Sequence, residues 1–261
     1  MSTSTALITG ASSGIGAVYA RRLAARGYDL VLVARRADRL DALATELSQD
    51  HAVTVRTLVA DLTEEAGLAR IEDLLRTGTI DMLVNNAGSG PIASTADLSD
   101  ADAAATLKLN VTALMRLTRA VLPGMRARSH GAIVNVGSVM AFHAMPMTSL
   151  YSATKAFVLT YSRAIQQEVR DAGIKVQAVL PAGTVTEFYD TAGVPITAFD
   201  QSVFMTAEQL VDAALVGLDR GEEVTLPSVH DTALWQAYDD ARAQLFAGTQ
   251  NGSPASRYLQ T

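Results

Sequence analysis

The most constraining feature of the sequence is a regular alternation of short apolar runs with longer helical patterns. An apolar, β-prone run at residues 5–9 leads through a glycine-rich turn into a helical pattern at about 15–26. The same order recurs, with further strands expected at residues 30–33, 53–59, 80–84, 132–136 and 176–180. These runs lack polar alternation, which is typical of parallel strands covered on both faces. The sequence therefore predicts an α/β fold, a three-layer doubly wound parallel sheet.

Two long helices and one irregular segment complete the expected organisation. The helices are predicted over residues 99–126 and 151–171. From 182 to 205 the regular pattern stops, and we interpret about 186–206 as a substrate lid, because long irregular segments in compact domains are usually functional or mobile. Residues 248–261 are expected to be a polar tail. Since no repeat or composition break divides the chain, 1–261 is predicted to be a single domain.

Composition excludes several kinds of chemistry. The chain has no cysteine, which rules out thiolate nucleophiles and disulfides and favours the cytoplasm as its compartment. The four histidines lack metal-ligand spacing, and no metal is predicted. No apolar run approaches the ~18 residues of a membrane span, and the N-terminus lacks the features of a signal peptide. A net charge of −6 argues against a nucleic acid or an anionic membrane as partner.

The turn after the first strand has the composition of a phosphate-binding loop. Residues 9–16 read TGASSGIG, where glycines allow a tight turn and the start of the next helix favours an anionic pyrophosphate. Its position between a strand and a helix is the one that a Rossmann-fold dinucleotide site requires. The residues predicted to bind the cofactor here are Gly10, Ser12, Ser13, Gly14, Ile15 and Gly16.

The residues after the second strand indicate which cofactor is bound. Sites for NAD usually place an acidic residue about twenty positions beyond the glycine turn, where this chain has Ala34. Arg35 and Arg36 follow, and their guanidinium groups suit charge-assisted contacts to a ribose 2′-phosphate. The sequence therefore predicts NADP(H) as the cofactor.

A tyrosine and a lysine four residues apart are the candidates for proton transfer. Tyr151 and Lys155 fall on one face at the start of a predicted helix, and the chain contains only three lysines. A nearby cation is expected to lower the phenol pKa from its usual value near ~10, which would make the pair a usable acid and base. Ser138 follows the strand at 132–136, where its hydroxyl can contact a substrate oxygen.

These segments together resemble the short-chain dehydrogenase/reductase family. The resemblance runs in order through TGASSGIG at 9–16, Asp61, NNAG at 85–88, Asn110, Ser138, YSATK at 151–155 and Pro181. It implies that the serine orients a carbonyl, that the tyrosine protonates it, and that the lysine also holds the nicotinamide ribose. It further implies that Asn110 holds a water that links the lysine to solvent. The segment at 27–47 is similar to the DltE-like branch of this family.

The resemblance also implies the remaining cofactor contacts. Asp61 and Leu62 would meet the adenine, Asn85 would lie beside the adenosine ribose, and Ala87 is also expected to bind the cofactor. The family usually reads PGxVxT after the sixth strand, and this chain reads PAGTVT at 181–186. Pro181, Thr184 and Thr186 are expected at the nicotinamide, with Ala182 in place of the family's glycine. The helices around Asn110 and Tyr151 would form the interface of a homodimer or homotetramer.

The expected activity is NADPH-dependent interconversion of an apolar ketone or aldehyde with its alcohol. Residues that suggest an apolar pocket are Met140, Phe142, Met145, Met147, Phe188, Tyr189, Val194, Ile196, Phe199, Phe204 and Met205. Two alternatives stay open, a catalytically silent NADP-binding redox sensor and a carrier-protein-linked 3-oxoacyl reductase. The second would need a basic docking surface, for which Arg126 and Arg128 are the only obvious candidates.

Overall fold

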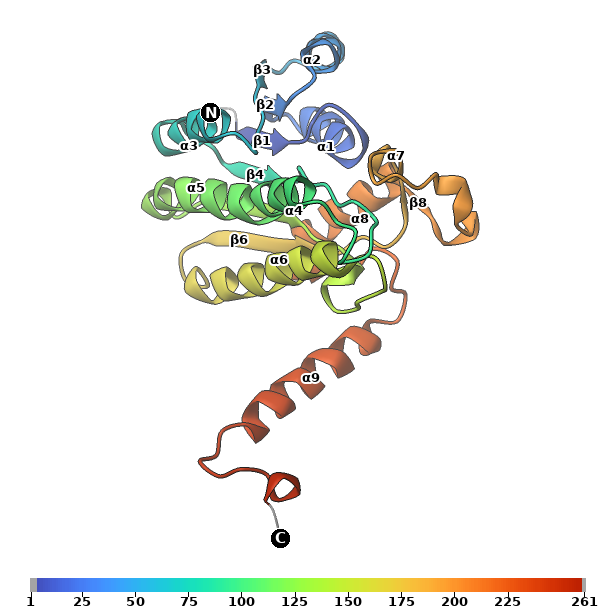
Figure 1. Ribbon diagram of the computed structural model, residues 1–261. Coiled ribbons are helices and arrows are strands. Elements are labelled where there is room, and N and C mark those ends of the chain that lie inside the picture. Colours follow the sequence, from blue (N-terminus) through green and yellow to red (C-terminus); the bar gives the residue numbers. More distant parts are fainter. Residues whose placement is uncertain (1–3, 260–261) are drawn as a thin grey trace. The chain divides into compact units, whose positions relative to one another are not determined.

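The computed structural model describes residues 4–259 and contains one large parallel sheet (Figure 1). Its strands are β1 (Thr5–Thr9), β2 (Asp29–Ala34), β3 (Val55–Val59), β4 (Met82–Asn85), β5 (Gly131–Val136), β6 (Ile174–Val179) and β9 (Val224–Thr225). Their order in space is β3-β2-β1-β4-β5-β6-β9, and every pairing is parallel. The order reverses between β1 and β4, and a ligand of a doubly wound sheet binds at the carboxyl ends of the strands at such a switch.

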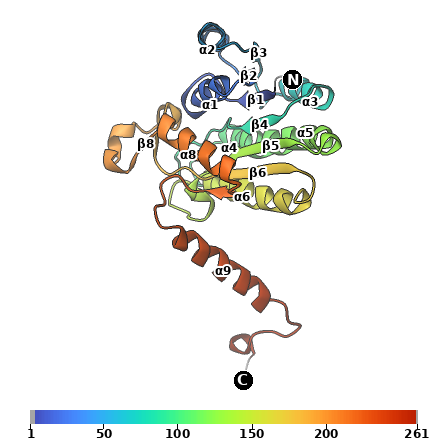
Figure 2. The same cartoon turned by 180° about the vertical axis from the view of Figure 1, so that it is seen from behind.

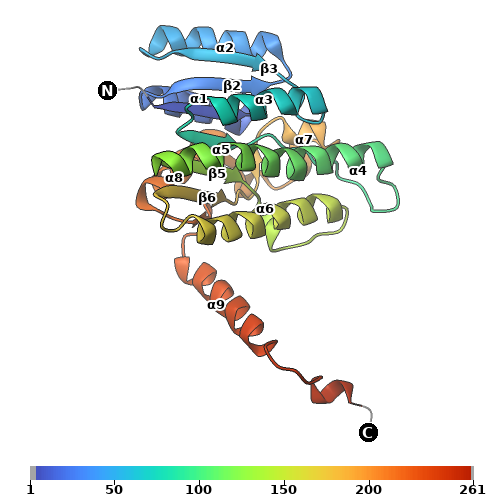
Figure 3. The same cartoon turned by 90° about the vertical axis from the view of Figure 1, so that its left-hand side faces the viewer.

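Helices cover both faces of the sheet and create two apolar cores. One core lies under α1 (Gly14–Ala25), α2 (Ala37–Asp50) and α8 (Ala207–Arg220) (Figure 2). The other lies under α3 (Glu65–Thr77), α5 (Leu114–Arg128) and α6 (Ser149–Glu168), which stand in front of the sheet in Figure 3. The predicted three-layer α/β fold is confirmed.

The expected helix at 99–126 is interrupted. Its first part is α4 (Asp100–Leu107), which Ser99 caps by accepting a hydrogen bond from the Asp102 amide at 3.1 Å. A π-helical turn, Lys108–Ala113, separates α4 from α5 and carries Asn110. Such π-bulges occur frequently at functional sites, because the extra residue in the turn changes the direction of a side chain.

The interpreted lid consists of short elements around an aromatic cluster. It follows β7 (Thr184–Val185) and contains α7 (Phe188–Thr191), two 3₁₀ turns (Ile196–Ala198 and Gln201–Val203) and β8 (Met205–Thr206). β7 and β8 pair with each other in a separate small sheet. The ring of Tyr189 packs on both Phe199 and Phe204, with centroids 5.4 and 5.3 Å apart.

The chain divides into two compact units, and the second begins at Ser228. The first unit, which ends at Pro227, contains the whole sheet. The second contains α9 (Thr232–Gly248) and a 3₁₀ turn (Ser256–Tyr258), and the described residues of α9 include none that is buried. The predicted polar tail thus begins at the end of α9, a helix that was not predicted from the sequence. Among residues 4–259, no helix has both the length and the hydropathy needed to cross a membrane.

Candidate active site

The glycine turn has the close packing expected of a phosphate-binding loop. Gly10 and Gly14 adopt positive φ angles of 67° and 51°, which glycine reaches without steric cost. A Cβ on Gly16 would overlap the carbonyl oxygen of Gly10. The turn is also held from outside, since Asn86 Nδ2 donates to the carbonyl oxygen of Thr9 at 2.9 Å. The backbone at the start of α1 is therefore fixed and accessible to a ligand at close range.

Within the described chain, the start of α1 has no side-chain cap from its N-cap residue, Ser13. Its hydroxyl instead accepts from Arg36 Nη2 at 2.7 Å, and the Ser12 hydroxyl accepts from the same guanidinium at 3.1 Å. The structure thus joins Arg36 to Ser12 and Ser13, two other residues that the sequence predicts to bind the cofactor.

Arg35 points toward a different predicted residue. Its Nη1 lies 3.8 Å from Asp61 Oδ2, and the Arg35 side chain is 76% exposed. Burial raises the pKa of Asp61, but hydrogen bonds from the Thr63 amide and hydroxyl, together with the charge of Arg35, outweigh this and hold the pKa below its usual value. Asp61 is therefore an ionised, oriented acceptor at the edge of the predicted adenine site.

The other predicted adenosine residues lie together beside a small cavity. Leu62, Asn85 and Ala87 all line it, next to Thr9. Asn85 is 4% exposed, and its Nδ2 donates to Thr118 Oγ1 at 3.0 Å and to Asn135 Oδ1 at 2.9 Å. The side-chain amide of Asn85 is thus bound within the core, whereas its carbonyl oxygen Oδ1 has no hydrogen-bond partner in the described protein.

Ser138 and Tyr151 meet beyond the carboxyl end of β5. Ser138 is 7% exposed, and its Oγ accepts from the Met140 amide at 3.1 Å and lies 3.5 Å from the carbonyl oxygen of Pro181. Tyr151 lies in the first turn of α6 and hydrogen-bonds to the Ser138 side chain. The Tyr151 ring also packs on Phe188 of α7, with centroids 5.4 Å apart. The predicted serine and tyrosine therefore share one site with the lid.

Lys155 lies beside the Tyr151 ring, and Asn110 and Lys155 both lie close to Gly88. Lys155 is 6% exposed, its Nζ is 5.6 Å from the centre of the Tyr151 ring, and it donates to the carbonyl oxygen of Val136 at 3.0 Å. Asn110 donates to the Ser89 carbonyl oxygen at 2.7 Å and accepts from the Ser89 amide at 3.0 Å. A Cβ on Gly88 would lie 3.4 Å from Asn110 Oδ1 and 3.5 Å from Lys155 Nζ. All four predicted catalytic residues thus gather at one end of the sheet.

The expected lowering of the Tyr151 pKa is wrong. Burial raises the pKa of Tyr151 to about 12, although the hydrogen bond with Ser138 acts in the opposite direction. Burial also lowers the pKa of Lys155 to about 8. The physical reason is that both groups share dry surroundings, in which the charged form of each is disfavoured. Tyr151 is therefore a protonated phenol at neutral pH.

The loop after β6 places its predicted residues in different surroundings. The Pro181 carbonyl oxygen accepts from the Val139 amide at 2.9 Å, next to Ser138. Thr184 is 5% exposed and its hydroxyl donates to the Ala182 carbonyl oxygen at 3.2 Å. Thr186 lies over the glycine turn, where a Cβ on Gly14 would be 3.1 Å from its methyl carbon. Pro181 and Thr186 therefore flank the site, whereas Thr184 is turned into the protein.

Three positions contribute to the site without having been singled out. The Thr9 hydroxyl accepts from the amides of Asn86 and Ala87, both at 3.0 Å. Gly90 is required because a Cβ there would overlap the Tyr151 ring. Glu187 accepts from Arg36 and Arg39. Position next to the NNAG motif was an available signal for Gly90, but none marked Glu187, which is more than 140 residues away from both arginines.

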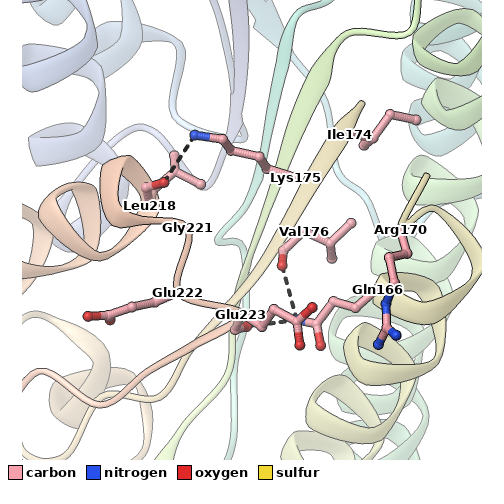
Figure 4. A pocket seen from close by; sticks show the side chains of 9 residues that line it. All are labelled: Gln166, Arg170, Ile174, Lys175, Val176, Leu218, Gly221, Glu222 and Glu223. Atoms are coloured by element: carbon pink, nitrogen blue, oxygen red, sulfur yellow. Dashed lines mark hydrogen bonds between the residues drawn. The ribbon is translucent and has the colours of Figure 1, made fainter. Parts of the chain in front are cut away.

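A separate pocket of about 150 Å³ lies away from these residues (Figure 4). Its lining comes from the amino end of β6, the ends of α6 and α8, and the turn after α8. Gln166 Nε2 donates to the Val176 carbonyl oxygen at 3.0 Å across it, and Lys175 Nζ lies 3.4 Å from the Leu218 carbonyl oxygen. Because the strands are parallel, the amino end of β6 is at the opposite edge from Ser138. We assign this separate pocket no part in the chemistry.

Comparisons with known proteins agree with this arrangement. The family model described as short chain dehydrogenase matches residues 4–193. A short-chain dehydrogenase from Sphingobium yanoikuyae, solved in complex with NADPH, is 48% identical with a TM-score of 0.94, covering 98% of this chain and 100% of that one. A bulky-bulky ketone specific alcohol dehydrogenase from Comamonas testosteroni is 42% identical with a TM-score of 0.91, covering 100% of both chains.

A curated relative is similar over a shorter stretch. The very-long-chain 3-oxoacyl-CoA reductase of Bos taurus is 38% identical over 186 residues, which make up 70% of this chain. The match spans only 60% of the length of the cattle protein. Because the family model covers every strand from β1 to β6 together with the serine, tyrosine and lysine of the site, this chain belongs to the short-chain dehydrogenase family.

Proposed function

We propose that the protein is an NADPH-dependent oxidoreductase that interconverts an apolar ketone or aldehyde with its alcohol. The observation that carries the proposal is the meeting of Ser138, Tyr151 and Lys155 at the carboxyl end of β5. The same end of the sheet holds the glycine turn that begins α1. A hydroxyl pair, a buried cation and an anion-binding turn at one edge are the parts that carbonyl reduction requires.

The residues present fit a nicotinamide dinucleotide with a 2′-phosphate. The turn at Gly10 and Gly16 leaves no room for side chains, so a pyrophosphate can approach the backbone closely. The first amides of α1 are not capped by Ser13 and would bind its charge. Arg36, held by Ser12 and Ser13, would bind the 2′-phosphate. When bound, the nicotinamide supplies the hydride that reduces the carbonyl carbon.

The side chains of the site would activate and protonate the substrate. Ser138 Oγ donates a hydrogen bond to the substrate carbonyl oxygen and fixes its position beside Tyr151 Oη. As negative charge develops on that oxygen, Tyr151 transfers its phenolic proton to it. Its pKa of about 12 keeps the proton in place until an alkoxide, which is more basic, forms. In alcohol oxidation the same proton returns to Tyr151.

Lys155 and Asn110 would support that proton transfer. The ammonium of Lys155 stabilises the phenolate left on Tyr151, which matters because both groups lie in dry surroundings. Asn110, fixed by Ser89 and by Thr154 at 3.0 Å, keeps the backbone around Gly88 in place next to Lys155.

An apolar substrate is favoured by the surroundings of Tyr151. Phe188 packs directly on it, and Tyr189, Phe199 and Phe204 continue the aromatic surface into the lid. On the side of α6, Phe142, Met145 and Met147 are exposed apolar side chains. The Comamonas relative, which its name describes as specific for bulky-bulky ketones, has the same overall fold. We therefore propose ketones with two large apolar substituents as the first substrate class.

The two alternative functions are less well supported. A silent redox sensor would not need the arrangement of Ser138, Tyr151 and Lys155. A 3-oxoacyl reductase is supported by the name of the cattle relative, but that match covers only 60% of the relative's length. The two arginines proposed to bind a carrier protein also form hydrogen bonds within this chain. Arg126 donates to the Glu168 carbonyl oxygen, and Arg128 donates to the Ile80 carbonyl oxygen. A cytoplasmic location and a homodimer or homotetramer remain predictions.

Steady-state kinetics with paired cofactors tests the proposal. Purified protein is given NADPH or NADH with aryl alkyl, diaryl and short aliphatic ketones, and with a 3-oxoacyl thioester. We expect oxidation of NADPH in preference to NADH, with the highest kcat/KM for ketones that have two bulky substituents. Arg36→Ala should weaken the binding of NADPH and not that of NADH. Arg22→Ala, which breaks a surface ion pair with Asp212, should change the binding of neither cofactor. Preference for the thioester would favour the 3-oxoacyl reductase, and binding of NADPH without turnover would favour the sensor.

A further inference from the structure

Arg36 connects the phosphate turn with the lid. Its Nε and Nη2 donate to Ser12 Oγ at 3.2 and 3.1 Å, and Nη2 also donates to Ser13 Oγ at 2.7 Å. On its other side, Nη1 donates to Glu187 Oε2 at 2.8 Å. Every nitrogen of this guanidinium is thus engaged, and one of its partners is a carboxylate from a segment 151 residues further along the chain.

Glu187 is bound by two arginines at once. Its second oxygen, Oε1, accepts from Arg39 Nη1 at 2.6 Å. The hydrogen bonds from Arg36 and then Arg39 lower the pKa of Glu187 to about 2, so the carboxylate is ionised at every physiological pH. Arg36 is the N-cap residue of α2 and Arg39 lies in its first turn. Two cations at a helix N-terminus oppose the helix dipole, and Glu187 supplies a negative charge that offsets them.

The carboxylate uses the donors that a 2′-phosphate would need. A phosphate on the ribose would be bound by the guanidinium of Arg36 next to Ser12 and Ser13, as the proposed function requires. In this structure Arg36 gives Nη1 to Glu187, and Arg39 gives its Nη1 to the same carboxylate. An anion of the protein therefore competes with an anion of the cofactor for the same guanidinium groups.

Glu187 also stands between the cofactor turn and the catalytic tyrosine. The residue before it, Thr186, lies over Gly14, and the residue after it, Phe188, packs on Tyr151 at 5.4 Å. Glu187 is the N-cap residue of α7, so its attachment fixes the first turn of that helix. The contact between Arg36 and Glu187 is thus linked to the glycine turn through Thr186 and to Tyr151 through Phe188.

We propose that Glu187 is a cofactor-specificity residue, a carboxylate that holds Arg36 and Arg39 in the cofactor-free protein and competes for them with the 2′-phosphate of NADPH. The proposal rests on the proposed function, because it assumes that Arg36 binds that phosphate. NADH, which has no 2′-phosphate, leaves the Glu187 pair intact. NADPH has to take Arg36 from Glu187 or bind with the two anions close together. Glu187 thus reduces the advantage that the arginines give to NADPH.

The size of the effect follows from exposure. The side chains of Glu187, Arg36 and Arg39 are 45%, 40% and 43% exposed, so each ion pair is screened by water. Pairs of this kind contribute little individually, and removing the competing carboxylate should tighten NADPH binding roughly three- to tenfold. Because the competition is electrostatic, the gain should shrink as salt is added.

Calorimetric titration of three ligands tests the proposal. NADPH, NADH and 2′,5′-ADP, a fragment that carries the 2′-phosphate without nicotinamide, are titrated into wild type, Glu187→Gln and Asp190→Asn. Asp190 is an exposed carboxylate on the same helix, and serves as the matched control. We expect Glu187→Gln to tighten NADPH and 2′,5′-ADP about three- to tenfold and to change NADH less than about twofold. Asp190→Asn should change the affinity for none of the three ligands. Glu187→Asp, which keeps the carboxylate, should bind them more nearly as wild type does than Glu187→Gln.

The outcomes separate this proposal from the function on which it rests. If wild type prefers NADPH but Glu187→Gln binds it no more tightly, Glu187 does not compete and the proposal is wrong. It is equally wrong if Glu187→Gln tightens the binding of NADH as much as that of NADPH, or if the gain is the same at about 0.5 M salt, where screening is stronger. If wild type binds NADPH no better than NADH and does not bind 2′,5′-ADP, the assignment of Arg36 to a 2′-phosphate fails first.

Discussion

The ammonium group of Lys155 lies 5.6 Å from the centre of the Tyr151 ring and donates to the carbonyl oxygen of Val136. Both side chains lie in dry surroundings, which raise the pKa of the phenol to about 12 and lower that of the amine to about 8. The site is thus built to hold a proton on Tyr151 and a positive charge on Lys155 near neutral pH. Holding that charge in a buried position lowers the stability of the protein.

Replacing the buried cation should therefore stabilise the protein while it abolishes activity. The lowered pKa of Lys155 corresponds to a cost of about 3 kcal/mol at neutral pH, part of which Lys155→Met would recover. The Val136 carbonyl would lose its donor, so we expect a net gain of about 2 kcal/mol in the free energy of unfolding. Urea denaturation measures the gain, and Lys175→Met, at an exposed lysine, should show none. A loss of stability in Lys155→Met would contradict this reading of the buried charge.

The stability of the wild-type protein should depend on pH through the titration of Lys155. Between pH 8 and 10.5 the unfolded chain keeps the Lys155 proton and the folded protein releases it. Since the unfolded state then binds more protons, the contribution of Lys155 to the free energy of unfolding rises with pH across this window. Comparison of wild type with Lys155→Met over this range isolates the contribution, because the stability advantage of the variant should fall as pH rises. Toward pH 10.5 it should become a deficit of about 1 kcal/mol, which is the lost hydrogen bond to the Val136 carbonyl.

Carbonyl reduction should lose rate above about pH 8. Reduction needs the proton on Tyr151, which is retained up to about pH 12, and the charge on Lys155, which is lost above about pH 8. The kcat/KM for ketone reduction is therefore expected to be level from pH 6 to about 8 and to fall beyond it. Initial rates with NADPH in overlapping buffers measure the profile. A profile that rises through pH 8 would show that Lys155 is not needed in its charged form.

The glycine turn should not tolerate a methyl group at Gly16. A Cβ there would overlap the Gly10 carbonyl oxygen and lie 2.6 Å from Asn86 Nδ2, so the turn must open. We expect Gly16→Ala to weaken NADPH binding at least ~10-fold and to lower the free energy of unfolding by about 1–3 kcal/mol. Gly124→Ala is the control, because Gly124 lies within α5 and a Cβ there meets only the flexible Arg128 side chain at 3.3 Å. That change should be neutral or stabilising by up to about 1 kcal/mol.

The fold could be predicted from the sequence because its signals are local. β1, β2 and β4 are short, mostly apolar runs, and TGASSGIG sits between β1 and α1 as the dinucleotide pattern requires. The π-helical turn at Lys108–Ala113 was not predicted, since no glycine or proline marks it in the sequence. The short strand β9 and the helix α9 were also missed. α9 has no buried residue in the described chain, so no core-facing periodicity marks it.

The candidate site was predicted in its members but not in its electrostatics. Spacing alone placed Tyr151 and Lys155 on one face of α6, and the structure confirms that they meet. The direction of the Tyr151 pKa shift was wrong because it depends on burial, which a sequence does not display. The contact of Glu187 with Arg36 joins two segments 151 residues apart, and such a contact exists only in the folded chain.

Tyr151→Phe tests the central claim most directly, because it removes a single oxygen and keeps the ring that packs on Phe188. The matched control is Tyr161→Phe, on the same helix, whose hydroxyl lies 3.5 Å from the Met115 carbonyl oxygen. The account predicts that Tyr151→Phe binds NADPH as wild type does and reduces a bulky ketone ~10²- to 10⁴-fold more slowly, while Tyr161→Phe keeps full activity. If Tyr151→Phe reduces the ketone within about twofold of the wild-type rate, Tyr151 does not supply the proton and the proposed mechanism is wrong.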